Sequence, residues 1–349
     1  SRISGVLPTA PTKPEVMPPI DWPQLWRVRA TITVEKRRKR VSEQNSQPQP
    51  LPLLNRYRLE LFNAHCSLVD QLFLRHWSKH LQSVKPSEAG NNAWSCLLID
   101  DRPSQQARIC ILNTLLMTRL KAKVTIFTPE RAADTFKALI EPWEAWIDVQ
   151  TLDAFGITDS LGWSGYNTLL KTADFWAQIN TEQTLIFQPD SLLISPLNLE
   201  ELNYSYAGSP WSKGKITSCE FPVYDKSLNW IGSHWANQAL CQTVPDTTNN
   251  GNGGLSVRNT KVMQAICADH AQASPPQEAE DIFFARHVNS PEYGATLPSQ
   301  SAIRKLFNES SYSDSCGFHG SWFYLDACEQ AKLYEKHVKH VIGMLTALS

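Results

Sequence analysis

The chain has 349 residues, of which 42% are hydrophobic and 19% charged; these are ordinary values for a globular protein and leave room for one large domain or two small ones. The formal net charge of -1 provides no overall positive field, so binding to nucleic acid is not expected. The sequence contains no apolar run of about 18 residues, so no membrane-spanning segment is predicted.

The first 55 residues differ in composition from the rest and are predicted to be an extension, with the main domain over residues 56–349. Nine prolines occur in the extension, and each restricts the backbone and removes a hydrogen-bond donor, which is typical of an extended or disordered arm. The basic run Lys36–Arg40 is predicted to be solvated, with contact to acidic lipid or polyphosphate as the alternative. Trp22 and Trp26 indicate that part of the arm packs on the domain.

Hydrophobic periodicity predicts helices and strands in alternation beyond the extension. In chain order these are a helix over 59–81, a turn at 87–92, a strand over 93–99, a helix over 107–120, a strand over 124–128, a helix over 132–139, a strand over 146–152, a helix over 166–179 and a strand over 184–188. After Leu199, Gly, Pro, Trp and Asn become frequent and strands are expected to be short, before a closing helix over 325–345.

This alternation predicts an α/β fold built on a parallel sheet. Ligands bind at the carboxyl ends of the strands in such sheets. Asp101 and Asp190 each follow a predicted strand, so both are expected at the binding edge. The loop-rich segment after Leu199 is expected to shape the ligand site.

The segment Gln188-Pro189-Asp190 follows a strand that should be buried, where a carboxylate needs a partner. A divalent cation bound together with a diphosphate is one such partner, because hard cations take oxygen ligands and keep phosphates and waters. The alternative is that Asp190, with Ser191, caps a following helix.

Glycines in the segment Gly251-Asn252-Gly253-Gly254 allow positive φ angles and a close approach of substrate to the backbone. A hairpin turn is the alternative interpretation. Arg258 follows soon after and would pair with a phosphate or carboxylate, or else brace a neighbouring loop.

Glu280 and Asp281 precede an apolar run and would open a helix, where acidic residues interact favourably with the helix dipole. The functional interpretation makes Asp281 the general base that takes the proton of an acceptor hydroxyl, with Glu280 orienting the acceptor. His319 lies in a Gly-flanked loop beside aromatic residues; it is predicted to join Asp190 on a metal, with a structural role as the alternative. None of the eight cysteines forms a CxxC pair, so the spacing gives no sign of a zinc ribbon.

Together and in this order, the motifs resemble an uncharacterised-domain family of GT-A-like glycosyltransferases found in microbes. The resemblance covers residues 93–322 and rests on Asp101-Arg102-Pro103, Tyr166-Asn167, Leu169-Leu170, Phe175-Trp176, Leu185–Ser191, Tyr206–Trp211, Gly251–Arg258, Glu280–Phe284 and Gly317-Phe318-His319.

The resemblance implies a GT-A-like, Rossmann-type mixed sheet flanked by helices, a nucleotide-sugar donor, and Mn²⁺ or Mg²⁺. By similarity, Gln188-Pro189-Asp190 takes the place of the usual DxD motif, with Asp190 as its metal-binding aspartate. The first acid of that motif is an amide here, which leaves one fewer charge for the cation. Gly-Ser-Pro-Trp stands where Gly-Ala-Pro-Trp is expected, which is a minor departure.

The sequence therefore predicts an inverting glycosyltransferase that acts on a glycan or another hydroxyl acceptor. The predicted donor-binding residues are Asp101, Arg102, Lys171, Gln188, Asp190 and Ser191; the acceptor-binding residues are Trp211, Gly253, Gly254 and Arg258; the catalytic residues are Asp281 and Glu280; and the metal ligands are Asp190 and His319. Two alternatives stay open: a non-catalytic carbohydrate- or nucleotide-binding protein on the same scaffold, and another enzyme such as a nucleotidyltransferase. A cytoplasmic location is expected, with the Golgi lumen as the alternative if an N-terminal anchor was removed.

Overall fold

The structure is a computed structural model, and it describes residues 53–86, 93–210, 223–224, 230–232, 251–275, 278–309 and 311–348. Apart from Leu53 and Leu54, these residues belong to one compact unit, Asn55–Ser349. No helix in the described part of the chain is long and apolar enough to cross a membrane. Trp22, Trp26, the run Lys36–Arg40, the predicted turn at 87–92 and Trp211 lie outside the described residues.

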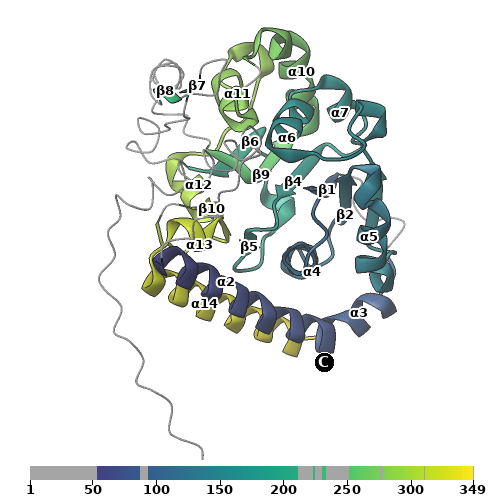
Figure 1. Cartoon of the computed structure of the whole chain (residues 1–349), viewed down its shortest axis with the longest axis vertical. Helices are drawn as coiled ribbons and strands as arrows, with labels where there is room; N and C mark the ends of the chain where they lie inside the picture. The colour runs from purple at the N-terminus through teal and green to yellow at the C-terminus, as the bar shows by residue number, and fades with distance from the viewer. Residues whose placement is uncertain are drawn as a thin grey trace, which may run out of the picture. The chain divides into compact units, whose positions relative to one another are not determined.

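A six-stranded mixed sheet in the order β3-β2-β1-β4-β9-β6 forms the centre of this unit (Figure 1). Its strands are β1 (Trp94–Ile99), β2 (Lys123–Thr128), β3 (Ile147–Thr151), β4 (Gln183–Phe187), β6 (Tyr206–Ser209) and β9 (Asn252–Asn259). Strands β1 to β4 run parallel to one another, and β9 runs antiparallel to both of its neighbours. The expected α/β fold, a mixed sheet flanked by helices, is confirmed.

Residues of the central strands alternate between two hydrophobic clusters. In β1, Cys96 and Leu98 belong to one cluster, and Leu97 and Ile99 belong to the other. Because successive strand residues point to opposite faces, the two clusters lie on the two sides of the sheet. Burial on both faces explains why these strands read as unbroken apolar runs in the sequence.

Helices cover both faces of the sheet (Figure 1). The first cluster includes residues of α4 (Gln105–Met117) and α5 (Glu130–Ile140). The second includes residues of α6 (Gly162–Leu170), α7 (Ala173–Ala177), α10 (Thr260–His270) and α11 (Glu280–His287). The shorter elements are η2 (Glu141–Trp143), η3 (Asp153–Phe155), η4 (Leu199–Glu201), η6 (Ala271–Ala273), η7 (Pro291–Tyr293), α12 (Gln300–Leu306) and α13 (Ser321–Tyr324).

The first predicted helix is helical throughout but contains a π-helical turn. It consists of α2 (Leu53–Leu72), the π turn η1 (Phe73–Trp77) and α3 (Ser78–Ser83). The closing helix α14 (Ala327–Thr346) lies beside α2 (Figure 1). A buried hydrogen bond of 2.9 Å between His65 Nε2 and His337 Nδ1 joins the two helices.

Two small sheets accompany the central one. Strands β10 (Phe307–Asn308), β11 (Gly317–His319) and β5 (Ser191–Leu193) form the first, and β7 (Val223–Tyr224) and β8 (Trp230–Gly232) form the second. Strand β11 runs antiparallel to β5, with His319 opposite Ser191. This pairing brings His319 to the turn that follows β4.

Three expectations from the sequence are corrected. The helix predicted over 166–179 is two helices, because Thr172 adopts an extended backbone (φ -103°, ψ 119°) between α6 and α7. Asp190 leads into strand β5, so the interpretation that it caps a helix is wrong. Gly253 and Gly254 lie inside β9, so the interpretation of a tight hairpin turn is also wrong.

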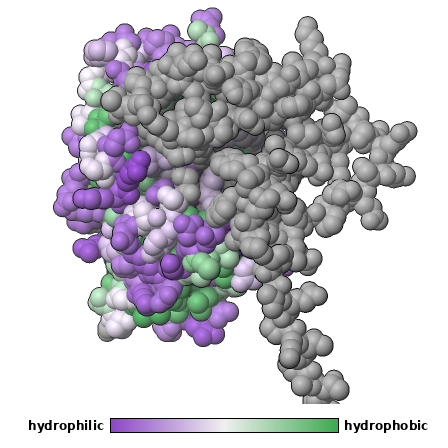
Figure 2. Space-filling view, turned by 90° about the vertical axis from the view of Figure 1, so that its left-hand side faces the viewer, coloured by the Kyte–Doolittle hydropathy of each residue, from purple (hydrophilic) through white to green (hydrophobic). Residues whose placement is uncertain are grey.

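On the face that Figure 2 presents, the described surface is mainly hydrophilic, with smaller hydrophobic areas. The large hydrophobic side chains that are exposed in the described part of the chain are Tyr57, Leu68, Leu74, Trp163, Ile342 and Leu348. Tyr57 and Leu68 lie in α2, Leu74 lies in η1, Ile342 lies in α14, and Leu348 follows α14. Trp163 lies in the first turn of α6.

Candidate functional site

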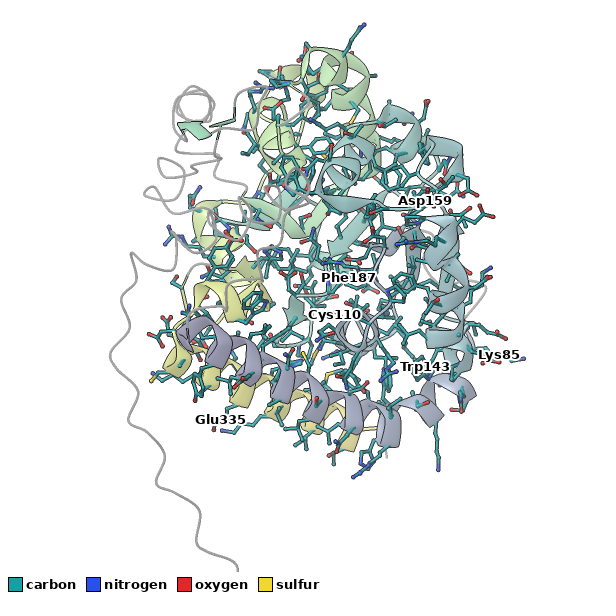
Figure 3. The ribbon with its side chains drawn as sticks, in the orientation of Figure 1. Lys85, Cys110, Trp143, Asp159, Phe187 and Glu335 are labelled. Carbon is teal, nitrogen blue, oxygen red and sulfur yellow. The ribbon has the colours of Figure 1, made fainter. Side chains whose placement is uncertain are left out.

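The turn after β4 is fixed by its own hydrogen bonds and by a cysteine. Ser191 N–H donates to the Gln188 carbonyl (2.9 Å), and Gln188 N–H donates to Ser191 Oγ (3.2 Å). The thiol of Cys110, labelled in Figure 3, donates to the carbonyls of Pro189 (3.0 Å) and Ser191 (2.9 Å). Burial raises the pKa of this thiol well above its ordinary value, so it stays a neutral donor. These contacts position Asp190 at the carboxyl edge of the sheet.

His319 lies close to Asp190, as the metal hypothesis requires. Its Nε2 is 3.4 Å from Asp190 Oδ1 and 3.1 Å from Gln188 Oε1, and its Nδ1 is 3.2 Å from Glu309 Oε2. The Asp190 side chain is 38% exposed, whereas those of His319 and Glu309 are 7% and 0% exposed, so the cluster opens at Asp190. Burial raises the pKa of Asp190, but the charges of His319 and Arg102 lower it more, and the net pKa is below the ordinary value.

Glu309 assigns different roles to the two ring nitrogens of His319. A carboxylate only accepts hydrogen bonds, so Nδ1 carries the proton that Glu309 shares. With the Gln188 amide oriented as in the structure, Nε2 faces two oxygens, an arrangement that a second ring proton or a bound cation satisfies. A carboxylate behind a histidine is the common support of a metal-binding imidazole.

The residues at this cluster supply only part of a coordination shell. Within the residues that the structure describes, no group of three or more His, Cys, Asp or Glu side chains could hold a metal ion by itself. Asp190, His319 and the Gln188 amide oxygen would leave the remaining positions of a Mg²⁺ or Mn²⁺ ion to diphosphate oxygens and water, which is how such ions are commonly bound.

Asp101 follows β1 and fastens the start of α6. Its Oδ2 accepts hydrogen bonds from Ser160 Oγ (3.0 Å), Leu161 N–H (2.8 Å) and Gly162 N–H (3.4 Å). Burial raises the pKa of Asp101, but these hydrogen bonds and the charge of Arg102 lower it more, so the side chain stays ionised. The observed role of Asp101 is to close the loop before α6; contact with a nucleotide stays a prediction.

Arg102 presents an accessible cation at the same edge. Its Nε and Nη2 donate to Asp100 Oδ1 (3.0 Å) and Oδ2 (2.7 Å). The Arg102 side chain is 74% exposed and that of Asp100 only 5%, so a buried carboxylate orients an open guanidinium. The hydrogen bonds that Arg102 donates to Asp100 raise the pKa of Arg102, and the charge of Arg102 helps lower the pKa of Asp190. The arrangement suits an anionic ligand beside Asp190.

Gly254 leaves space where β9 passes His319. A Cβ at this position would collide with the His319 ring and lie 2.8 Å from Gln188 Oε1. Gly254 N–H donates to Asn252 Oδ1 (2.8 Å), and its carbonyl accepts from Ser191 Oγ (2.9 Å). Any side chain here would displace the groups predicted to hold the cation.

Gly253 makes the corresponding close approach to the acidic pair at the start of α11. Its N–H donates to Asp281 Oδ2 (3.3 Å), and its carbonyl accepts from Arg258 Nη2 (3.3 Å). A Cβ here would collide with the Glu280 carboxylate and the Arg258 guanidinium. Two consecutive glycines therefore lie against the two groups of predicted functional residues.

Arg258 and Glu280 form a buried ion pair. Arg258 Nη1 and Nη2 donate to Glu280 Oε2 (2.5 Å) and Oε1 (3.0 Å), and the side chains are 0% and 4% exposed. The guanidinium carbon also lies 4.9 Å from the Tyr206 ring centroid, 5.2 Å from that of Phe284 and 5.9 Å from that of Trp176. These contacts match the alternative that Arg258 braces neighbouring segments, and they engage both carboxylate oxygens of Glu280.

Asp281 has the environment of a general base. It lies in the first turn of α11, where Oδ2 accepts from Gly253 N–H (3.3 Å) and Oδ1 from Ile282 N–H (2.8 Å). Burial, followed by the negative charge of Glu280, raises the pKa of Asp281 from 3.8 to about 6. A carboxylate with this pKa is mostly ionised at neutral pH and is a better proton acceptor than an ordinary aspartate.

Another predicted residue, Lys171, does not join this arrangement. The Lys171 ammonium donates to Ser274 Oγ (3.0 Å) and to the carbonyls of Pro275 (3.3 Å) and Glu278 (2.8 Å). Lys171 thus holds the segment that leads into α11, and burial lowers its pKa. Trp211, a predicted acceptor-binding residue, lies outside the described residues.

The sequence interpretation missed three supporting residues. Asp100 was overlooked beside Asp101, although its position directly after a buried strand was an available signal. Cys110 lies in an apolar run that gives no sign of a functional role, yet its thiol bonds to the turn that carries Asp190. Glu309 had no sequence signal, because its contact with His319 depends on the pairing of β10 with β11.

Residues 152–319 match a family model whose description is a protein of unknown function, DUF5672. The matched segment begins just after β3 and ends at His319, so it contains Asp190, both glycines of β9 and Asp281, but neither Asp101 nor Arg102. No curated protein matches the chain.

Solved structures similar to this one include the apo form of mouse xyloside xylosyltransferase 1, with 11% sequence identity, a TM-score of 0.35 and coverage of 65% of this chain and 97% of that chain. The mannosyltransferase PcManGT from Pyrobaculum calidifontis, solved in complex with GDP-Man and Mn²⁺, shows 11% identity and a TM-score of 0.34 over 84% of this chain and 86% of that chain. The 4-diphosphocytidyl-2C-methyl-D-erythritol synthase from Anaerococcus prevotii DSM 20548 shows 9% identity and a TM-score of 0.34 over 56% of this chain and 82% of that chain.

Proposed function

We propose that this protein is a glycosyltransferase that moves a sugar from a nucleotide-sugar donor to a hydroxyl group of a glycan or another acceptor. The observation that carries the proposal is the pair of consecutive glycines at the start of β9. Gly253 bonds to the Asp281 carboxylate, and Gly254 lies against His319. A substrate lying across these glycines would meet a proton acceptor on one side and a cation-binding cluster on the other.

The donor diphosphate would bind at the cluster around Asp190. Asp190 and His319, with Gln188 as an oxygen ligand, fit Mn²⁺ or Mg²⁺, and Glu309 would orient the imidazole. Such an ion offsets negative charge on a departing diphosphate. Arg102, which is exposed and held beside Asp190, would add a second positive group for the same diphosphate.

Two further residues, Asp101 and Ser191, would shape the donor pocket by holding backbone segments in place. Asp101 holds the loop before α6 at the carboxyl end of β1, where the nucleotide is expected. Ser191 Oγ donates a hydrogen bond to the Gly254 carbonyl. This bond holds the turn after β4, and with it the proposed diphosphate site, against β9. Lys171 is assigned no part in donor binding, because its ammonium is already bonded within the chain.

Asp281 would act as the general base for the acceptor hydroxyl. Direct attack of that hydroxyl on the anomeric carbon, with departure of the diphosphate from the opposite side, would invert the configuration. Glu280, held by Arg258, would contribute by raising the pKa of Asp281 through its charge rather than by touching the acceptor. Trp211 remains the proposed stacking wall for a sugar.

One observation favours a different function. Gln188 stands where an acid would give a cation a second carboxylate, so the cluster holds less negative charge than a strong metal site would. A non-catalytic protein that binds a nucleotide or a carbohydrate is the corresponding candidate.

A panel of nucleotide sugars, incubated with Mn²⁺ and mixed hydroxyl acceptors, distinguishes the two functions. The glycosyltransferase releases nucleoside diphosphate from at least one donor, and Asp281→Asn suppresses the release while donor binding persists. Tight binding of a nucleotide sugar with no release by the wild-type protein would favour the binding protein.

A further inference from the structure

The hydroxyl of Tyr166 has no hydrogen-bond partner in the described structure. Tyr166 lies on α6, and its oxygen is shielded from solvent. Buried hydroxyl groups are nearly always hydrogen-bonded, because an unsatisfied one destabilises the folded state. A ligand that offers an acceptor at this point would remove the cost, so the hydroxyl marks a candidate contact.

Neighbouring groups locate this hydroxyl within the candidate site. The adjacent residue, Asn167, accepts a hydrogen bond from Glu280 N–H (2.7 Å), which holds α6 against the start of α11. The carboxylates of Glu280 and Asp281 act electrostatically on the phenol. The Gln188 side chain lies near enough to lower the pKa of the phenol, but it does not meet the distance and angle of a hydrogen bond to the hydroxyl. Tyr166 is therefore within reach of both the proposed base and the proposed diphosphate cluster.

The phenol can act only as a hydrogen-bond donor or neutral acceptor. Burial raises the pKa of Tyr166 far above its ordinary value and the charge of Glu280 raises it further, while Arg258 and Gln188 offset this only in part. The hydroxyl consequently keeps its proton throughout the physiological pH range. It has no role as a base, and its ligand needs an oxygen that can accept a hydrogen bond from the hydroxyl.

We propose that the Tyr166 hydroxyl binds a hydroxyl oxygen of the sugar that is transferred. The inference rests on the proposed function. In a displacement with inversion, the anomeric carbon lies between the attacking oxygen, near Asp281, and the departing diphosphate, near Gln188 and Asp190. A side chain within reach of both ends therefore faces the sugar ring. A sugar hydroxyl supplies the missing acceptor, and Tyr166 would help to select the donor sugar.

The test compares Tyr166→Phe with the wild-type protein on a panel of UDP-glucose, UDP-xylose and GDP-mannose with Mn²⁺. The substitution removes only the hydroxyl. For the donor that is used best, kcat/KM should fall about tenfold, the size expected for one neutral hydrogen bond. Affinity for the matching nucleoside diphosphate should not change. Analogues of that donor that each lack one sugar hydroxyl identify the contact. For one analogue, kcat/KM should be lower than for the intact donor with the wild-type protein, but not with the variant.

Tyr334→Phe is the matched control. The Tyr334 hydroxyl is also buried, but it is bonded to Ser321 (3.1 Å) and Gln330 (2.8 Å) and lies on α14. This control should lower the melting temperature and leave kcat/KM unchanged, whereas Tyr166→Phe should leave the melting temperature unchanged or higher.

If the wild-type protein is active, each of three outcomes would overturn this inference without overturning the proposed function. They are an unchanged kcat/KM in Tyr166→Phe, an equal loss of affinity for the nucleoside diphosphate, and a melting temperature that falls as far as in Tyr334→Phe. If the wild-type protein neither binds nor turns over any donor of the panel, the proposed function fails, and the inference fails with it.

Discussion

Replacing Asp281 with Asn should slow transfer strongly and at the same time stabilise the protein at neutral pH. A group whose pKa is raised on folding contributes stability below its unfolded pKa and loses it as the pH rises through the folded pKa. The pKa of Asp281 is raised from 3.8 to about 6, chiefly by burial and then by the charge of Glu280. The wild-type protein therefore loses stability between about pH 4 and pH 6 because of this one carboxylate.

The magnitude follows from the same pKa values. Each pKa unit corresponds to about 1.4 kcal/mol, so the ionised Asp281 destabilises the fold by at most about 3 kcal/mol at pH 7. Solvent screening of this partly exposed side chain reduces the expected effect to about 1–2 kcal/mol. The variant also loses the proton acceptor, so transfer should fall by about 10²–10⁴-fold, as is typical for a general base.

The assay measures urea unfolding at pH 4 and pH 7.5, nucleoside diphosphate affinity, and transfer rate on one preparation. Asp281→Asn should gain stability at pH 7.5, gain nothing at pH 4 and bind the nucleotide normally. Asp174→Asn is the matched control, because Asp174 also lies in the first turn of a helix but is exposed in α7. A lower free energy of unfolding at pH 7.5 together with the native transfer rate would refute the reasoning and leave Asp281 as a helix-stabilising residue.

Three further outcomes are expected. Asp190→Ala and His319→Ala should each remove the Mn²⁺ dependence of nucleoside diphosphate binding in calorimetry, and unchanged dependence in both would contradict the metal assignment. Gly254→Ala should weaken the same binding at least tenfold, because its Cβ would collide with His319; native affinity would show that the diphosphate binds elsewhere. Burial lowers the pKa of His65 to about 3 and that of His337 well below its ordinary value, so stability should fall as the pH drops below about 6.5, by up to about 1.4 kcal/mol per pH unit for each histidine. A His65→Asn variant should show a shallower acid slope.

Local sequence patterns predicted those strands that are buried enough to be composed mainly of apolar residues. The apolar run before Asp100 becomes β1 and the run before Gln188 becomes β4, because strands covered on both faces carry apolar residues at most positions. Acidic residues directly after such runs could be expected at the carboxyl edge of the sheet, which is where Asp101 and Asp190 lie. The extension over residues 1–55 and the roles of the site residues stay predictions.

Only the tertiary structure decided which side chains meet and which are already bonded to partners within the chain. His319 reaches Asp190 through the pairing of β11 with β5, a contact between segments far apart in the sequence. Arg258 and Lys171 look like free cations in the sequence, yet each is bonded to a partner brought to it by folding. Composition and periodicity describe how polar a segment is, whereas the availability of a charge depends on burial and on partners in other elements. For the same reason the unpaired hydroxyl of Tyr166 is visible only in the folded chain.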